Sequence, residues 1–100
     1  MNYEEFILLI AKSNRQTQLN KYLNILWYDA KGNWDIAHKL VNSIYNHNGS
    51  LLHAYLHRKE GDLANAAYWY SIAGEKMPNS SLKEEWEELV KKYLNYKDRE

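Results

Sequence analysis

Cysteine is absent from this sequence, and proline and glycine are scarce, with one and four copies among 100 residues. Without cysteine the chain can form neither disulfides nor thiolate metal sites. Because glycine and proline mark most turns, their scarcity leaves long stretches in which nothing interrupts a helix. No segment alternates strictly between apolar and polar residues, so we expect no β-sheet.

An excess of either charge is also missing, because 13 Lys and Arg residues balance 13 Asp and Glu residues. Nucleic-acid-binding surfaces usually show a basic excess or stripe, so we expect no nucleic-acid partner. The apolar run at residues 6–11 is too short to span a bilayer, and it follows two glutamates rather than a basic region. We therefore expect a cytoplasmic protein with no membrane partner, whose zero net charge permits self-association.

Large apolar side chains are abundant, since the sequence is 45% hydrophobic and includes nine Tyr and four Trp. One hundred residues fit a single domain with one core. Apolar residues recur at helical spacing in six segments, near residues 3–13, 18–30, 34–45, 51–60, 63–74 and 82–94. We expect polar connections at residues 14–17 and 46–50 and a frayed tail at 95–100. The predicted fold class is all-α, with about six helices.

Two glycines, Gly32 and Gly61, stand at predicted turns between helices and are 29 residues apart (61 − 32). Each precedes a residue that favours the N-cap of a helix, Asn33 or Asp62. The alanines that follow each turn share the same offset. A helix–glycine–cap–helix unit that recurs in this way is typical of a stacked helical array.

Residues 50–79 resemble a tetratricopeptide repeat in the small residues, the turn and the helix stop of that motif: Ala54, Gly61-Asp62-Leu63, Ala66, Tyr70, Ala73 and Pro78-Asn79. Residues 19–48 resemble it more weakly, because Ile25 stands where the first helix of the motif has a small residue. The resemblance implies antiparallel hairpins, at residues 19–48 and 49–79, stacked as a short superhelix. Residues 1–18 and 80–100 would then be capping helices.

A second resemblance rests on the segment H-A-Y-L-H-R-K-E-G-D at residues 53–62, followed by N-A-x-Y-W-Y-x-x-A-G at residues 65–74. This segment is similar to one in a family of small, functionally uncharacterised bacterial proteins. The resemblance implies a bacterial cytosolic origin and implies no activity.

Histidines form the most distinctive polar pattern, because His53 and His57 are four residues apart and share one helix face. His38, on the apolar face of the preceding helix, could join them, and Glu60 or Asp62 could add an oxygen ligand. The repeat motif usually holds packing residues at the first two positions, however. We therefore expect buried histidines hydrogen-bonded to tyrosine or carboxylate groups, with a metal site as the alternative.

Charged residues crowd the second turn, where Arg58 stands close to Glu60 and Asp62 in the sequence. They could form a buried network that sets the stacking of the hairpins, or a solvated cluster of ion pairs. The aromatic run Tyr68-Trp69-Tyr70 points in three directions on a helix, so we expect it to pack rather than to form a ligand platform.

The binding groove of tetratricopeptide proteins is formed by the first helix of each hairpin. The resemblance therefore implies a protein-binding surface made of aromatic, aliphatic and basic residues, unless the last helix covers it. The residues at these positions are Tyr22, Leu26, Leu51, Tyr55, Arg58 and Lys59.

The expected function is a non-catalytic protein-interaction or scaffold module without a cofactor, whose partner is another protein or a second copy. We find neither a nucleophile elbow around a serine nor a phosphate-binding glycine loop. The alternative is a metal- or small-molecule-binding protein, such as a hydrolase, centred on His38, His53, His57 and Glu60.

Overall fold

The computed structural model describes residues 1–12 and 18–96 of the chain. These residues form helices and no strand, which confirms the all-α prediction. The helices are α1 (Tyr3–Ala11), α2 (Lys21–Ala30), α3 (Trp34–Val41), α4 (His47–Glu60), α5 (Leu63–Ala73) and α6 (Leu82–Leu94). None of them is long and apolar enough to cross a lipid bilayer. The predicted connection at 14–17 and the end of the tail lie outside the described residues.

The two predicted glycine turns join α2 to α3 and α4 to α5. Gly32 and Gly61 have φ angles of 84° and 90°, in the left-handed region where a residue without Cβ is favoured. Asp62 caps α5 by accepting a hydrogen bond from the backbone N–H of Asn65 at 3.3 Å. Asn33 occupies the N-cap position of α3, but its side chain makes no capping bond. Each pair of helices packs together along its length.

The boundary between α3 and α4 differs from the prediction, because α4 begins at His47 rather than near residue 51. The Asn46 side chain accepts a hydrogen bond from the Gly49 N–H at 2.8 Å and starts the helix there. Gly49 lies inside the first turn, where a Cβ would clash with the backbone of Ile44. Gly49 therefore permits the backbone of α4 to lie close to the backbone at Ile44. The predicted boundary between the two hairpins, at residues 48 and 49, falls inside α4.

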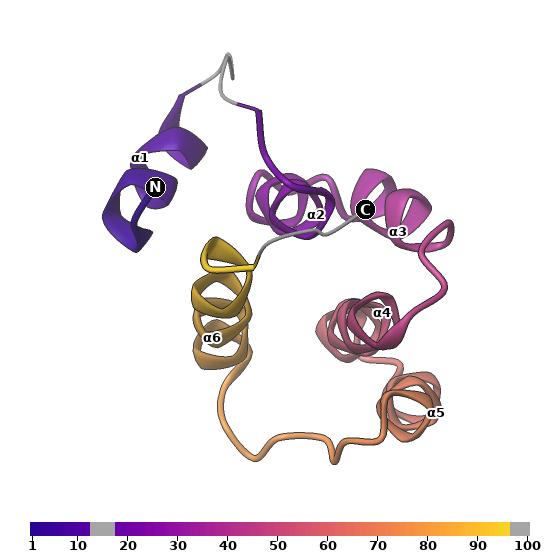
Figure 1. Cartoon of the computed structure of the whole chain (residues 1–100). Coiled ribbons are helices and arrows are strands. Elements are labelled where there is room, and N and C mark those ends of the chain that lie inside the picture. The colour runs from indigo at the N-terminus through magenta and orange to yellow at the C-terminus, as the bar shows by residue number, and fades with distance from the viewer. Residues whose placement is uncertain (13–17, 97–100) are drawn as a thin grey trace.

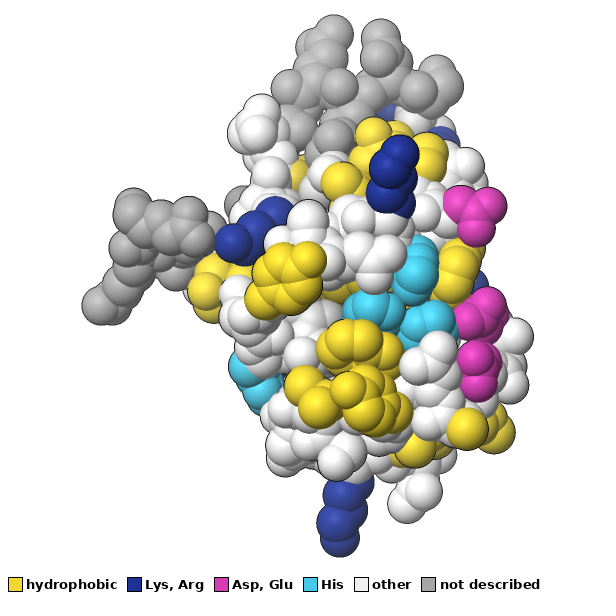
Figure 2. Space-filling view, turned by 90° about the vertical axis from the view of Figure 1, so that its right-hand side faces the viewer, with side chains coloured by type: hydrophobic (Ala, Val, Ile, Leu, Met, Phe, Trp, Pro, Cys, Tyr) yellow, Lys and Arg dark blue, Asp and Glu magenta, His cyan; other side chains and the backbone are white. Residues whose placement is uncertain are grey.

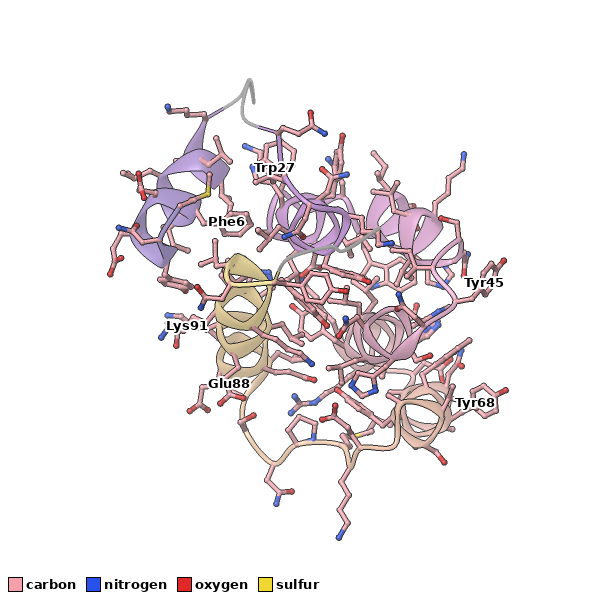
Figure 3. All side chains as sticks on the ribbon, in the orientation of Figure 1. Phe6, Trp27, Tyr45, Tyr68, Glu88 and Lys91 are labelled. Atoms are coloured by element: carbon pink, nitrogen blue, oxygen red, sulfur yellow. The ribbon has the colours of Figure 1, made fainter. Side chains whose placement is uncertain are left out.

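Helices α2 and α4 occupy the middle of the molecule, with α3 and α5 on one side and α6 on the other (Figure 1). Two contacts attach α6 to α2: the Tyr22 and Tyr93 rings lie 4.8 Å apart, and the Trp86 indole N–H donates to the Leu26 carbonyl at 3.3 Å. Helix α1 packs outside α6 and points Phe6, fully buried, toward the core (Figure 3).

The surface that the sequence predicted as a binding groove is covered by α6. Tyr22, Leu26, Leu51 and Tyr55 are all at most 6% exposed. Arg58 is half-buried, and only Lys59 remains exposed at the edge. Of the two predicted possibilities, an open groove and a groove covered by the last helix, the structure shows the covered one, because the apolar stripe of α6 buries itself on this surface.

Two buried acidic residues accept hydrogen bonds from side chains of neighbouring helices. Glu85 of α6 accepts hydrogen bonds from the Arg58 guanidinium at 2.8 Å and from the Tyr70 hydroxyl at 2.6 Å. Asp29 of α2 accepts from the Tyr55 hydroxyl and the Lys59 ammonium, both at 2.8 Å. The predicted partners of Arg58 on its own turn are therefore wrong, since its side chain points to α6 instead.

Burial and these hydrogen bonds raise the pKa values of Tyr55 and Tyr70. Burial and then the hydrogen bond to Glu85 raise the pKa of Tyr70 far above its usual value. Burial and the charge of Asp29 do the same to the pKa of Tyr55. Both hydroxyls therefore stay protonated and act as hydrogen-bond donors at any physiological pH.

The substitution Glu85→Ala is expected to lower the free energy of unfolding by about 3 kcal/mol, because it leaves the Arg58 charge buried without its partner. Urea denaturation measures the loss. Glu88→Ala is the matched control, because Glu88 is exposed on the same helix and points away from the core (Figure 3); we expect a change within about 0.5 kcal/mol. Equal losses in the two variants would show that the buried pair does not hold α6.

Candidate metal centre

Three histidines from two helices meet on the side of α4 that is away from α6. His53 and His57 are one helical turn apart on α4, and His38 approaches from α3, which packs against that helix. The Nε2 atoms of His38 and His53 are 3.2 Å apart. All three residues place a ring nitrogen within 4.8 Å of the other two. His53 and His57 are buried, whereas His38 is half-buried.

Two tryptophans stack on two of the three histidine rings. Trp34 stacks on His38 with ring centroids 4.8 Å apart, and Trp69 of α5 stacks on His53 at 4.0 Å; both pairs are tilted by only 9°. The Trp34 indole N–H is itself fixed by donating to the Leu56 carbonyl at 2.8 Å. The planes of two of the three imidazoles are therefore set by packing.

A carboxylate orients the third imidazole. The Nδ1 atom of His57 lies 2.6 Å from Glu60 Oε2, so the Nδ1–H donates to that carboxylate in the neutral ring. The lone pair is then on Nε2, and the amide of Asn65 approaches this atom at 3.4 Å as a weak donor. A histidine whose other nitrogen donates to a carboxylate is the arrangement that usually supports metal ligands.

Burial favours the neutral form of two of the three histidines. It lowers the pKa of His53 to about 4, and repulsion from His57 and His38 adds to the effect. Burial, followed by the charge of His57, also lowers the pKa of His38. Both rings are therefore uncharged near pH 7, which is the form in which an imidazole binds a metal ion.

One separation between ring nitrogens matches the distance between two ligands of a tetrahedral ion. Zinc–nitrogen bonds of about 2.0–2.1 Å require ligand nitrogens about 3.3 Å apart in a tetrahedron, and the observed His38–His53 separation is 3.2 Å. The three histidines gather at the surface in Figure 2, beside a group of hydrophobic side chains. One side of such an ion would face solvent.

Most of the sequence-predicted residues come together here. The structure joins His38, His53, His57 and Glu60, and Asp62 has a carboxylate oxygen within 4.8 Å of His57 and Glu60. Arg58 does not belong to the site. Of the predicted tyrosine or carboxylate partners of the buried histidines, the described residues show the carboxylate, Glu60 on His57; the other partners are a neighbouring histidine and Asn65.

Three further contributors were not predicted: Trp34, Asn65 and Trp69. A local pattern pointed to them, since Trp34 precedes His38 by four residues and Asn65 precedes Trp69 by four. Residues at this spacing share a helix face. The sequence did not indicate that the two faces meet over α4.

Comparison with protein-family models, with curated proteins and with solved structures finds no match to this chain. The resemblance to tetratricopeptide repeats and to the bacterial family therefore stays a prediction. The geometry of the site is what remains to support a function.

The metal-free protein is expected to lose stability as the pH falls from about 6.5 to about 4. The pKa of His53 is lower in the folded state than in the unfolded chain, so protons bind preferentially to the unfolded chain in this window. The loss should be on the order of 3 kcal/mol. Denaturation at a series of pH values measures it, and NMR titration reports the pKa of His53 directly.

His53→Phe should remove most of this pH dependence, because phenylalanine retains the stack on Trp69 but does not titrate. His47→Gln is the control, since His47 is half exposed and pairs only with Glu75 at 3.0 Å among the described residues. A folded-state pKa of His53 near 6.5 would contradict the burial of a neutral ring.

Proposed function

We propose that this protein binds one divalent transition-metal ion of the zinc class through His38, His53 and His57. The observation that carries the proposal is the convergence of three imidazoles from two helices, each with a ring nitrogen within 4.8 Å of the other two. Imidazole ligands suit zinc, copper, iron and nickel, whereas magnesium and calcium prefer oxygen. Glu60 supports the proposal because it accepts the Nδ1–H of His57. The lone pair of His57 is then on Nε2, where it can bind a metal ion.

The competing interpretation is that the histidines are simply packing residues. Apolar residues would fill the same space at lower cost, because buried imidazole nitrogens must be supplied with hydrogen-bond partners. The lowered pKa of His53 likewise makes the folded state less stable at acidic pH. Residues that reduce stability in this way are typical of functional sites, where binding offsets the cost.

Three protein ligands leave the fourth position of a tetrahedral ion open. Structural zinc sites usually fill all four positions with side chains, whereas sites that take a water or a ligand use three. His38 is half-buried, so the open position would be reached from solvent. The proposed centre is therefore a binding site for an exchangeable ligand rather than a structural metal site.

Isothermal titration of tag-free protein with Zn²⁺ is expected to show one site. Removing one ligand by His53→Ala or His57→Ala should weaken binding by at least about 100-fold, and Glu60→Gln by about 10- to 100-fold through the loss of ring orientation. His47→Ala should bind Zn²⁺ as the wild type does, because the His47 ring pairs with Glu75 outside the cluster.

Circular dichroism of each variant separates loss of a ligand from loss of the fold. Two results would contradict the proposal: zinc binding that is unchanged in His53→Ala and His57→Ala, or an equal loss in His47→Ala. A folded His53→Ala variant that no longer binds zinc would support it.

An interaction module remains a second candidate, and an exposed apolar surface favours it. On α1 and just before it, Met1, Ile7 and Leu8 are 50%, 39% and 65% exposed. This surface is separate from the one that α6 covers. Since the net charge of the chain is zero, little repulsion would oppose pairing with a second copy through this surface.

Sedimentation velocity tests this second candidate. If α1 forms a contact between copies, the wild type should sediment as a dimer at high concentration, and Leu8→Lys should shift it toward monomer because a charge would be buried. Leu63→Lys is the control, since Leu63 is 56% exposed on α5. A wild type that stays monomeric, or an identical effect of both substitutions, would remove α1 as the contact.

A further inference from the structure

A groove of about 530 Å³ opens directly beside the histidine cluster. It lies among the end of α3, the beginning of α4 and α5. Most of its wall is apolar, formed by Val41, Ile44, Tyr45, Trp69 and Ile72. Figure 2 shows hydrophobic side chains next to the histidines on this face of the molecule. Pockets of about 300–1,000 Å³ accept small organic molecules.

The groove and the proposed metal centre share a wall. His53 lines the groove and also contributes Nε2 to the cluster. Trp69, which stacks on His53 at 4.0 Å, lines the groove as well. An ion held by His53 would therefore lie at the boundary of the groove, within reach of a ligand that occupies it.

Ser50 provides a polar group with no partner in the protein. It precedes His53 by three residues and lines the same groove, although the residue is only 8% exposed. Its hydroxyl makes no side-chain hydrogen bond with any residue in the part of the chain that the structure describes. The hydroxyl can therefore donate to or accept from a polar atom of a ligand in the groove.

The rim of the groove includes two exposed apolar side chains. Tyr45 is 92% exposed and Ile72 is 55% exposed. Tyr45 points outward from the connection between α3 and α4 (Figure 3). An apolar ligand body would remove part of this surface from water.

Charge decides the chemistry of the group that would face the ion. Imidazole binds a metal ion as a neutral ligand, so three histidines leave both positive charges of a divalent ion uncompensated in the coordination shell. Glu60 contributes only through His57. An anionic donor is therefore favoured at the open position.

We propose that the groove binds a small carboxylate with an aromatic or branched apolar body. The carboxylate coordinates the ion next to His53, the Ser50 hydroxyl donates to it or to a neighbouring polar atom, and the body lies against Trp69 and Ile72. This inference rests on the proposed metal binding and adds the class of ligand. A cavity of this size is too small for a protein domain, so a small molecule is the favoured occupant.

Protein loaded with Co²⁺, a spectroscopic substitute for zinc, tests the inference through its visible absorption. The probes are 3-phenylpropanoate and acetate, which share a carboxylate and differ in the apolar body. We expect both to change the spectrum, with 3-phenylpropanoate binding at least about tenfold more tightly, because only its ring reaches the groove.

Ile72→Asn should reduce the advantage of 3-phenylpropanoate several-fold without changing acetate binding. Ile36→Asn is the matched control, because Ile36 is 43% exposed on α3 and does not line the groove. Ser50→Ala should weaken both carboxylates. Circular dichroism confirms that each variant is folded.

The outcomes distinguish the two proposals. If Co²⁺ binds through the histidines but the two carboxylates bind equally, the groove inference is overturned and metal binding stands. If 3-phenylpropanoate binds metal-free protein just as tightly, coordination by the ion is refuted. If no Co²⁺ binds, both proposals fail. If Ile72→Asn changes the oligomeric state and not the carboxylate preference, the groove is a protein contact instead.

Discussion

The burial of α4 is the constraint on which the rest of the structure depends. Every residue from 51 to 57 is buried, because α3 and α5 pack on one side of this helix and α6 on the other. A helix enclosed in this way must find partners within the protein for most of its polar side chains. Tyr55 therefore bonds to Asp29, Arg58 to Glu85, and the two histidines to a third histidine and to Glu60.

These polar contacts divide the molecule into two unlike sides. Toward α6 the buried charge of Glu85 is paired with the Arg58 guanidinium and accepts from the Tyr70 hydroxyl. Toward α3 and α5 three imidazole rings lie next to one another, beside a serine hydroxyl that lines a groove. The first side is suited to hold the fold, and the second retains unused capacity to bind. The location of a candidate site follows from this difference.

Prediction from the sequence succeeded where spacing along one helix was enough. The pair His53 and His57 and the turns at Gly32 and Gly61 were found because they depend on residues close together in the chain. Glu85 was missed although it lies on the apolar stripe of the last helix, three residues after Leu82 and four before Leu89, where a charge is unexpected. The start of α4 was misplaced because Gly49 resembles a turn glycine, whereas its role is a close contact with Ile44.

The sequence by itself determined the helices, the two glycine turns and the shared face of His53 and His57, since local propensity and the helical repeat suffice for these. Only the tertiary structure decided that α6 occupies the expected groove, that His38 and Trp69 converge over α4, and that Ser50 is left facing a cavity. These features depend on contacts between residues far apart in the chain. The apolar faces of several helices could each have packed on the same surface. Which helix packs there depends on how the side chains fit when all the helices are packed together.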